Sequence, residues 1–173
     1  MLYGHLVHNK FDFLEFLNKK SHFYVIYIDG SKSTNSVRAA YYDLQKNSLK
    51  NIKLEENCSI FTTESYAIVS ALVFVNNFVH NVNILIVSDS KSVLESLYNC
   101  NYSYIGVKTE FVWVPSHSGI PGNEVVEQVA RRDHVEDQSE MLNVLFTDYY
   151  RLIKNLILLV AISVNTVLKT MQT

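Results

Sequence analysis

One short stretch of the chain, Phe23 to Ser31, constrains the fold more than any other. It reads FYVIYIDGS, so six apolar or aromatic residues precede a single carboxylate, Asp29, and Gly-Ser follows directly. β-Branched and aromatic residues bounded by turn residues predict a buried strand that ends at Asp29. An ionised carboxylate beside a core costs free energy unless something compensates its charge. Taken alone, Asp29 is more simply interpreted as a turn residue that caps the strand end.

The composition indicates a folded protein rather than a disordered one. The chain has 173 residues, of which 48% are hydrophobic and 18% charged, enough for one domain with a real core. Its formal net charge is −2, so a polyanion would have to be bound by a local patch or by bound metal rather than by bulk charge. Basic residues that could form such a patch, if they cluster, are Lys32, Lys91, Arg131 and Arg132.

Three features bear on the compartment. Cys58 and Cys100 lack metal-ligand spacing and indicate thiols in a reducing environment. The N-terminal sequence lacks a basic region followed by an apolar run, so no signal peptide is expected. The longest apolar run, residues 156–164, is much shorter than the roughly 20 residues that span a bilayer. We therefore expect an intracellular protein, cytoplasmic or nuclear, that has no membrane partner.

The remaining pattern alternates between strands and helices. Further strands are expected at residues 37–44, 49–54, 83–87 and 109–114. The first three strands are joined by short polar turns, which predicts an antiparallel meander. The strand–helix–strand order before residues 83–87 predicts that this strand lies parallel to, and beside, the first one. The expected fold class is therefore α/β, with a five-stranded mixed sheet flanked by helices.

The domain organisation predicted from these changes in pattern has three parts. Residues 1–20 are interpreted as an N-terminal leader or linker remnant, and residues 21–133 as the α/β domain. After a polar linker, residues 141–168 have a high apolar content, so residues 134–173 are interpreted as a C-terminal helical appendage.

Three more carboxylates lie at the edges of apolar elements. Glu64 follows Thr62 and Thr63, which are plausible helix N-caps, and precedes Ile68 by four residues, so it lies on the apolar face of its helix. A helix-capping role explains Glu64 about equally well. Asp89 ends the strand at residues 83–87, and as a single residue it is more simply explained as the N-cap of the next helix. Glu127 follows Asn123, the expected N-cap of another helix.

Together the four carboxylates indicate a shared site. Strand ends and helix starts can meet at one edge of an α/β sheet. Like charges at such short distances repel one another, so a cluster of carboxylates makes sense if divalent cations neutralise it. Hard oxygen ligands favour Mg²⁺ or Mn²⁺. Two such ions clamp the attacking and leaving oxygens in phosphodiester hydrolysis. His117, in a loop between a strand and a helix, is either a solvated residue or a proton carrier for this chemistry.

Four motifs in order carry a resemblance to a known family. They are YIDGSK at residues 27–32, IFTTESYAI at 60–68, VSDS at 87–90 and WVPSHSGIPGNE at 113–124. This set resembles a type 1 ribonuclease H domain, most of all the domain in the polyproteins of insect non-LTR retrotransposons. The resemblance covers residues 23 to about 132.

The resemblance implies a ribonuclease H-like fold, two Mg²⁺ ions (or Mn²⁺ in their place) and hydrolysis of the RNA strand of RNA–DNA hybrids. Asp29, Glu64 and Asp89 match the metal-binding catalytic carboxylates, and His117 matches the family's loop histidine. Glu127 matches the fourth metal-ligand position. Residues expected to bind nucleic acid are Gly30, Ser31, Lys32, Ser90 and Asn123. Expected partners are the hybrid and a reverse transcriptase module, and the protein is expected to be a monomer.

The chain departs from the family pattern at Glu127, where the family has Asp. The extra methylene moves the carboxylate by roughly 1.5 Å, against the Mg²⁺–oxygen distance of about 2.1 Å that this ion holds tightly. Val126 also replaces a residue that is usually small. Three readings therefore stay open: an active hybrid ribonuclease, a catalytically weakened nucleic-acid-binding module, and a transposon relic without activity.

Overall fold

A computed structural model describes residues 7–79, 82–97, 103–104 and 107–132 of the chain. Its strands are β1 (Phe23–Lys32), β2 (Val37–Asp43), β3 (Ser48–Lys53), β4 (Asn83–Ser88), β5 (Ser103–Tyr104) and β6 (Val107–Trp113). Its helices are α1 (Lys10–Lys19), α2 (Ile60–Phe78), α3 (Lys91–Leu97) and α4 (Pro121–Ala130).

The strands form one mixed sheet in the order β3-β2-β1-β4-β6-β5. β1, β2 and β3 pair antiparallel as a meander, whereas β4 lies parallel to β1, and β6 lies parallel to β4. The two-residue strand β5 adds a short antiparallel pair at the edge of β6. The predicted α/β fold class is confirmed, with an antiparallel meander joined to parallel strands and with residues 83–87 parallel to the first strand; β5 adds a short sixth strand to the five predicted.

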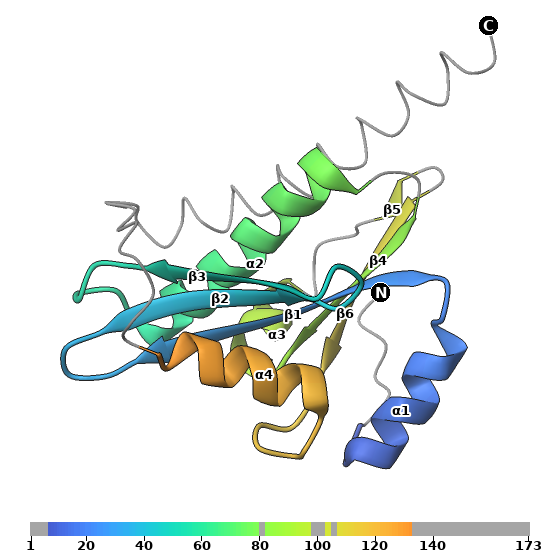
Figure 1. Ribbon diagram of the computed structural model, residues 1–173, viewed down its shortest axis with the longest axis horizontal. Helices are drawn as coiled ribbons and strands as arrows, with labels where there is room; N and C mark the ends of the chain where they lie inside the picture. Colours follow the sequence, from blue (N-terminus) through green and yellow to red (C-terminus); the bar gives the residue numbers. More distant parts are fainter. Residues whose placement is uncertain (1–6, 80–81, 98–102, 105–106, 133–173) are drawn as a thin grey trace, which may run out of the picture.

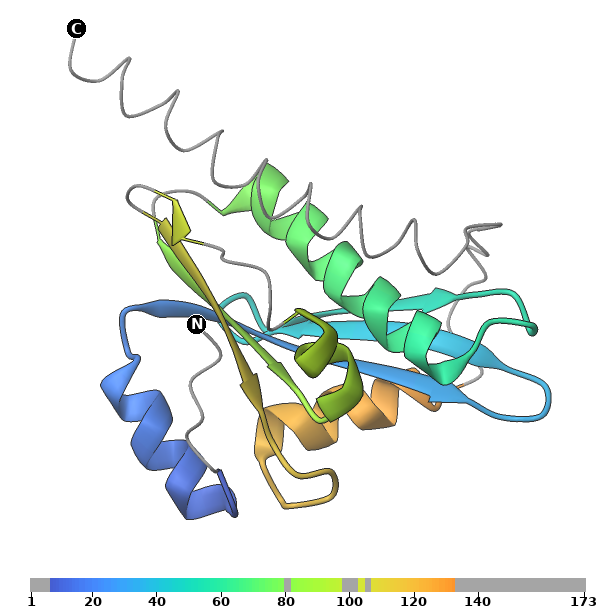
Figure 2. The same ribbon diagram turned by 180° about the vertical axis from the view of Figure 1, so that it is seen from behind.

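Helices cover both faces of the sheet, as Figures 1 and 2 show from opposite sides. α2 and α3 bury Ile68, Leu72 and Leu94 against one face. α1 and α4 bury Phe13 and Val126 against the other face. Because both faces are covered, the central strands are apolar on both sides, which explains the continuous apolar runs in β1 and β4. Ile68, which marks the predicted apolar face of this helix, is buried in α2 together with Ala71, Leu72 and Val75.

The predicted end of the first strand at Asp29 is wrong, because β1 continues to Lys32. Asp29 pairs with Ala40 of β2, and the antiparallel ladder extends to the pair Lys32 and Val37. The turn follows only at Ser33, whose N–H donates to the carbonyl of Ser36 over 2.8 Å. Asp29 is therefore a buried strand residue and not a turn residue, which makes its carboxylate harder to explain without a function.

The expected starts of α2 and α4 are displaced. α2 begins one turn earlier than predicted, with Ser59 rather than a threonine as its N-cap; the Ser59 hydroxyl accepts a hydrogen bond from the backbone N–H of Thr62 over 3.0 Å. Glu64 is consequently beyond the first turn. α4 begins at Pro121, which suits the first helical position because its missing N–H would have no partner there. Asn123 is therefore inside α4 rather than its N-cap, and Glu127 lies in the second turn of the helix.

The N-terminal segment contributes α1, whose Phe13 and Phe16 are buried against the same sheet face as α4. Within the described residues, no helix has the length and apolar character needed to cross a membrane. The predicted C-terminal appendage, the apolar run at residues 156–164 and Cys100 lie outside the described residues.

Candidate active site

Parallel pairing of β1 and β4 brings two aspartates to the same edge of the sheet. Tyr27 is opposite Val87 in this ladder, and Asp29 and Asp89 each follow that pair by two residues. Asp29 is in β1, and Asp89 lies between β4 and α3. The backbone of Asp89 is held by Trp113 of β6, whose indole N–H donates to the Asp89 carbonyl over 2.9 Å.

The third carboxylate, Glu64, reaches the two aspartates because Gly30 has no side chain. A Cβ atom on Gly30 would lie 2.8 Å from the backbone nitrogen of Glu64 and 3.1 Å from its Cγ and Cδ atoms. Any larger residue at position 30 would therefore push α2 away from β1. Gly30, which the resemblance places near the substrate, also has this structural role.

Asp29, Glu64 and Asp89 form the first carboxylate cluster, in which oxygens from all three side chains lie within 4.8 Å of one another. Asp29 and Glu64 are each only 6% exposed, and Glu64 Oε2 is buried without a hydrogen-bond partner. Burial and the carboxylates of Asp89 and Glu127 raise the pKa of Asp29 to about 7. Burial and the carboxylates of Asp29 and Asp89 raise the pKa of Glu64 well above its ordinary value.

These observations fit a divalent cation. A buried carboxylate oxygen without a donor is costly, and three converging carboxylates repel one another, so the cluster is under-compensated as it stands. A hard cation with oxygen ligands would supply the missing positive charge and a partner for Glu64 Oε2. The donor set contains no sulfur or imidazole, which favours Mg²⁺ or Mn²⁺ over zinc.

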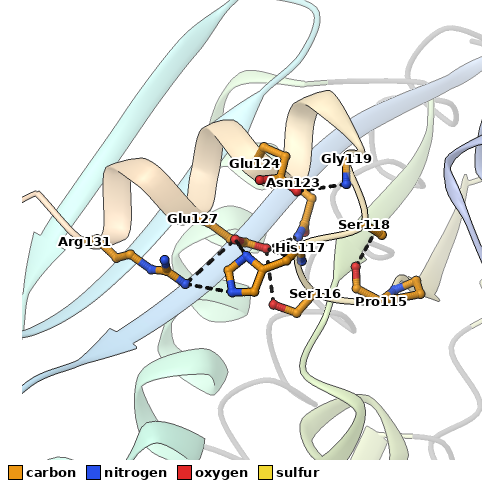
Figure 3. A network of polar contacts seen from close by, with 9 residues as sticks. All are labelled: Pro115, Ser116, His117, Ser118, Gly119, Asn123, Glu124, Glu127 and Arg131. Carbon is orange, nitrogen blue, oxygen red and sulfur yellow. Dashed lines mark hydrogen bonds and ion pairs between the residues drawn. The ribbon is translucent and has the colours of Figure 1, made fainter.

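Glu127 belongs to a different group, shown in Figure 3. Its Oε1 accepts hydrogen bonds from Asn123 Nδ2 at 2.7 Å, from the backbone N–H of His117 at 3.3 Å and from the Ser116 hydroxyl at 3.4 Å. Its Oε2 lies 2.7 Å from Nδ1 of His117. The Glu127 carboxylate is thus almost fully buried, but unlike Glu64 it is surrounded by donors.

This second carboxylate group holds the loop between β6 and α4. His117 has a positive φ of 53°, a conformation that is uncommon for a residue with a side chain. Glu127 contacts both the backbone and the ring of His117, which stabilises that conformation. Glu124 acts on the same loop, because its Oε1 accepts a hydrogen bond from the N–H of Gly119 over 3.0 Å.

The two groups face one cavity of about 320 Å³. Its lining residues are Asp29, Gly30, Ser31, Lys32, Ile60, Glu64, Asp89, Ser116, Glu127 and Arg131. Two predicted nucleic-acid-binding residues are not among them. Asn123 is 1% exposed and donates to Glu127, and the backbone of Ser90 donates to the Ser88 hydroxyl.

Sequence reasoning did not assign a site role to Ser116 or Trp113, and it named Arg131 only as one of four basic residues that could form a polyanion-binding patch. Ser116 directly precedes His117, and Arg131 follows Glu127 by one helical turn, so spacing could have indicated both. The role of Trp113 in holding Asp89 depends on the pairing of β4 with β6, which no local pattern reveals.

No family model and no curated protein matches the chain. Among solved structures, it is similar to an RNase H1 from the halophilic archaeon Halobacterium salinarum NRC-1, with 16% identity, a TM-score of 0.45 and coverage of 61% of this chain and 92% of that chain. It is also similar to a foamy viral protease-reverse transcriptase in complex with dsDNA, with 18% identity and a TM-score of 0.46. That match covers 80% of this chain and 76% of that chain. A third similar structure is LC11-RNase H1, isolated from compost, with 15% identity and a TM-score of 0.46. That match covers 63% of this chain and 96% of that chain. The fold of this chain is defined by its own strand order and pairing.

Proposed function

We propose that the protein is a metal-dependent endonuclease that hydrolyses the RNA strand of RNA–DNA hybrids. The observation that carries this proposal is the first carboxylate cluster, in which three carboxylates from β1, α2 and the end of β4 meet in a cavity. The order of the four sequence motifs supports the substrate class. The same motifs support derivation from a retrotransposon of the insect non-LTR type, and a reverse transcriptase module as a partner.

Asp29, Glu64 and Asp89 would hold the cations. When bound, divalent cations would lower the pKa of the attacking water and stabilise the negative charge that develops on the phosphoryl oxygens. Burial of Asp29 and Glu64 excludes competing water, and their raised pKa values mean that a cation binds in competition with protons.

His117 is proposed to carry a proton, and Glu127 to orient it. The contact between Glu127 Oε2 and His117 Nδ1 leaves Nε2 as the ring atom that would accept or release a proton. We propose that Glu127 serves this purpose rather than that of a fourth cation ligand, since its oxygens already have partners in Asn123, Ser116 and His117.

The substrate would be recognised along the β1 edge of the cavity. Hybrid recognition requires contacts to 2′-hydroxyl groups on one strand and to deoxyribose on the other. Ser31 and the backbone at Gly30 line the cavity and are suited to such contacts. Lys32 donates to the carbonyls of Cys58 and Glu56 at 2.6 and 3.2 Å, so it also connects β1 to the segment before α2.

The second candidate function is a nucleic-acid-binding module that cleaves poorly. It is favoured by one observation: Glu127 is already engaged with the His117 loop, so the second of two cations would lack a ligand that the resemblance assigns to it. This candidate predicts hybrid binding without appreciable turnover.

Cleavage of a labelled RNA–DNA hybrid separates these functions. The purified chain would be incubated with hybrid in millimolar Mg²⁺ or Mn²⁺, beside an Asp29→Asn variant, with RNA duplex and DNA duplex as substrate controls. We expect cleavage of the RNA strand of the hybrid only, and loss of cleavage in the variant. If the wild type and the variant both bind the hybrid but neither cleaves it, the result would support the binding module. An absence of both binding and cleavage would contradict both functions.

A further inference from the structure

Arg131, at the C-terminal end of α4, reaches the edge of the His117 ring (Figure 3). Its Nη2 atom lies 3.2 Å from Nε2 of His117 and 3.9 Å from Oε2 of Glu127. Arg131 therefore contacts the ring atom that the proposed function uses for proton transfer.

The chemistry of the guanidinium defines the tautomer of His117. A guanidinium donates hydrogen bonds but cannot accept them, so Nε2 must accept and must carry no proton. The proton of the ring is then on Nδ1, where it is donated to Glu127 Oε2 over 2.7 Å. In the free protein the lone pair of His117 Nε2 thus faces the guanidinium of Arg131.

The contact that covers Nε2 is suited to being replaced. The side chains of Arg131 and His117 are both 59% exposed, so water can replace the hydrogen bond between them at little cost in stability. A guanidinium pairs more strongly with a phosphate group, through charge-assisted and frequently bidentate hydrogen bonds. The other cationic side chain that lines the cavity, Lys32, already donates to two backbone carbonyls.

We propose that Arg131 binds the phosphodiester backbone of the nucleic-acid strand and in doing so uncovers Nε2 of His117. In the free protein Arg131 holds the ring in a covered state, and the bound strand draws the guanidinium away. The histidine then becomes available only where a phosphodiester is in place. This inference rests on the proposed function, because it takes the bound polyanion to be the nucleic-acid substrate.

Salt dependence of hybrid binding tests the contact with the strand. Binding of a short labelled hybrid to the full chain would be measured at several salt concentrations in Ca²⁺, which neutralises carboxylates with less strict geometry than Mg²⁺. Arg131→Met should lower the slope of log K against log salt by about 1, and Arg131→Lys should restore it. The matched charge control is Lys19→Met, on α1 and outside the cavity, which should leave the slope unchanged.

The ring nitrogen signals of His117 test the covering of Nε2. In ¹⁵N NMR spectra at one pH, the free wild type should show a proton on Nδ1 and a hydrogen-bonded Nε2. Arg131→Met should shift the Nε2 signal toward that of a free lone pair and leave Nδ1 protonated. Addition of hybrid to the wild type should shift Nε2 in the same direction.

The outcomes separate this inference from the proposed function. If hybrid is bound and cleaved but Arg131→Met leaves both the salt slope and the Nε2 signal unchanged, the role of Arg131 is overturned and the nuclease stands. An Nε2 signal that does not respond to hybrid also overturns the release of His117. If the wild type binds no hybrid, the proposed function fails and the release step fails with it, whereas the comparison of free wild type with Arg131→Met still decides whether Nε2 is covered.

Discussion

The two carboxylate groups that face the cavity differ in how their charge is compensated. In the first cluster Asp29 and Glu64 are buried beside Asp89, and Glu64 Oε2 has no partner. In the second group Glu127 is equally buried, yet it accepts hydrogen bonds from Asn123 and His117. Acidic composition alone therefore does not identify a cation site. What distinguishes the first cluster is that its internal donors are too few. The Gly30 N–H donates to Asp29 and Glu64, but Glu64 Oε2 has no partner, and a divalent cation would supply one.

The largest effect is expected on catalysis when the first cluster loses one ligand. Asp89→Asn should lower the rate of hybrid cleavage about 1,000-fold, since loss of cation-based charge stabilisation costs roughly 4 kcal/mol of the barrier. Single-turnover cleavage in saturating Mg²⁺ measures this effect. If the variant retains more than a tenth of the wild-type rate, Asp89 is not a cation ligand, and the contrast between the two carboxylate groups fails.

Neutralisation of Asp29 should stabilise the cation-free protein. Its folded-state pKa of about 7 is above the ordinary value of 3.8, so the stability that the protonated group contributes is lost as the pH rises through 7. At about pH 8 in EDTA, Asp29→Asn should raise the free energy of unfolding by roughly 2–4 kcal/mol. Urea unfolding measures the gain, which should shrink toward pH 5. A destabilised variant at pH 8 would show that internal donors already compensate Asp29.

Gly30→Ala should disrupt the first cluster without touching the second group. The added methyl meets the backbone nitrogen of Glu64, and such overpacking costs about 1–3 kcal/mol of stability. Urea unfolding and Mg²⁺ titration would both be measured, and both stability and cation affinity should fall. Gly119→Ala is the control, because its Cβ meets nothing within 4 Å even though its φ of +73° disfavours alanine. Unchanged cation affinity in Gly30→Ala would contradict the placement of Glu64.

Neutralisation of Glu127 should have the opposite sign to that of Asp29. Glu127→Gln keeps one oxygen for Asn123 and the His117 backbone but replaces Oε2, which accepts from His117 Nδ1, by an NH2 group, and this should lower the free energy of unfolding by about 1–2 kcal/mol. The same urea experiment in EDTA at about pH 8 gives the value, so the two variants form a matched pair. Stabilisation by Glu127→Gln would show that the two groups are alike.

Much of the fold was predictable because its signals are local. The apolar runs of β1 and β4 and the helical spacing of Ile68, Leu72 and Val75 define buried elements directly. The ends of elements were less predictable, because they depend on pairing with a neighbour. β1 passes through Asp29 because β2 continues to pair with it, and α2 begins at Ile60 because the Ser59 hydroxyl is available as a cap.

The candidate site was predictable in its residue types but not in its grouping. Four carboxylates at element edges indicated one shared centre, and the structure brings Asp29, Glu64 and Asp89 together as expected. The association of Glu127 with His117 was not predictable, since it depends on the positive φ of His117 and on the early start of α4. Side-chain length matters here as well, because the additional methylene of Glu relative to Asp extends the reach of its carboxylate.

Calorimetric titration of the apo-protein with Mg²⁺ tests the central claim most directly. Wild type, Asp89→Asn and Glu127→Gln would be compared at one pH, with Mn²⁺ as a second probe. The account predicts binding by the wild type, loss of that binding in Asp89→Asn, and an affinity within about threefold of wild type in Glu127→Gln, since less than about 1 kcal/mol is at stake there. An absence of cation binding by the wild type, or equal losses in the two variants, would contradict it.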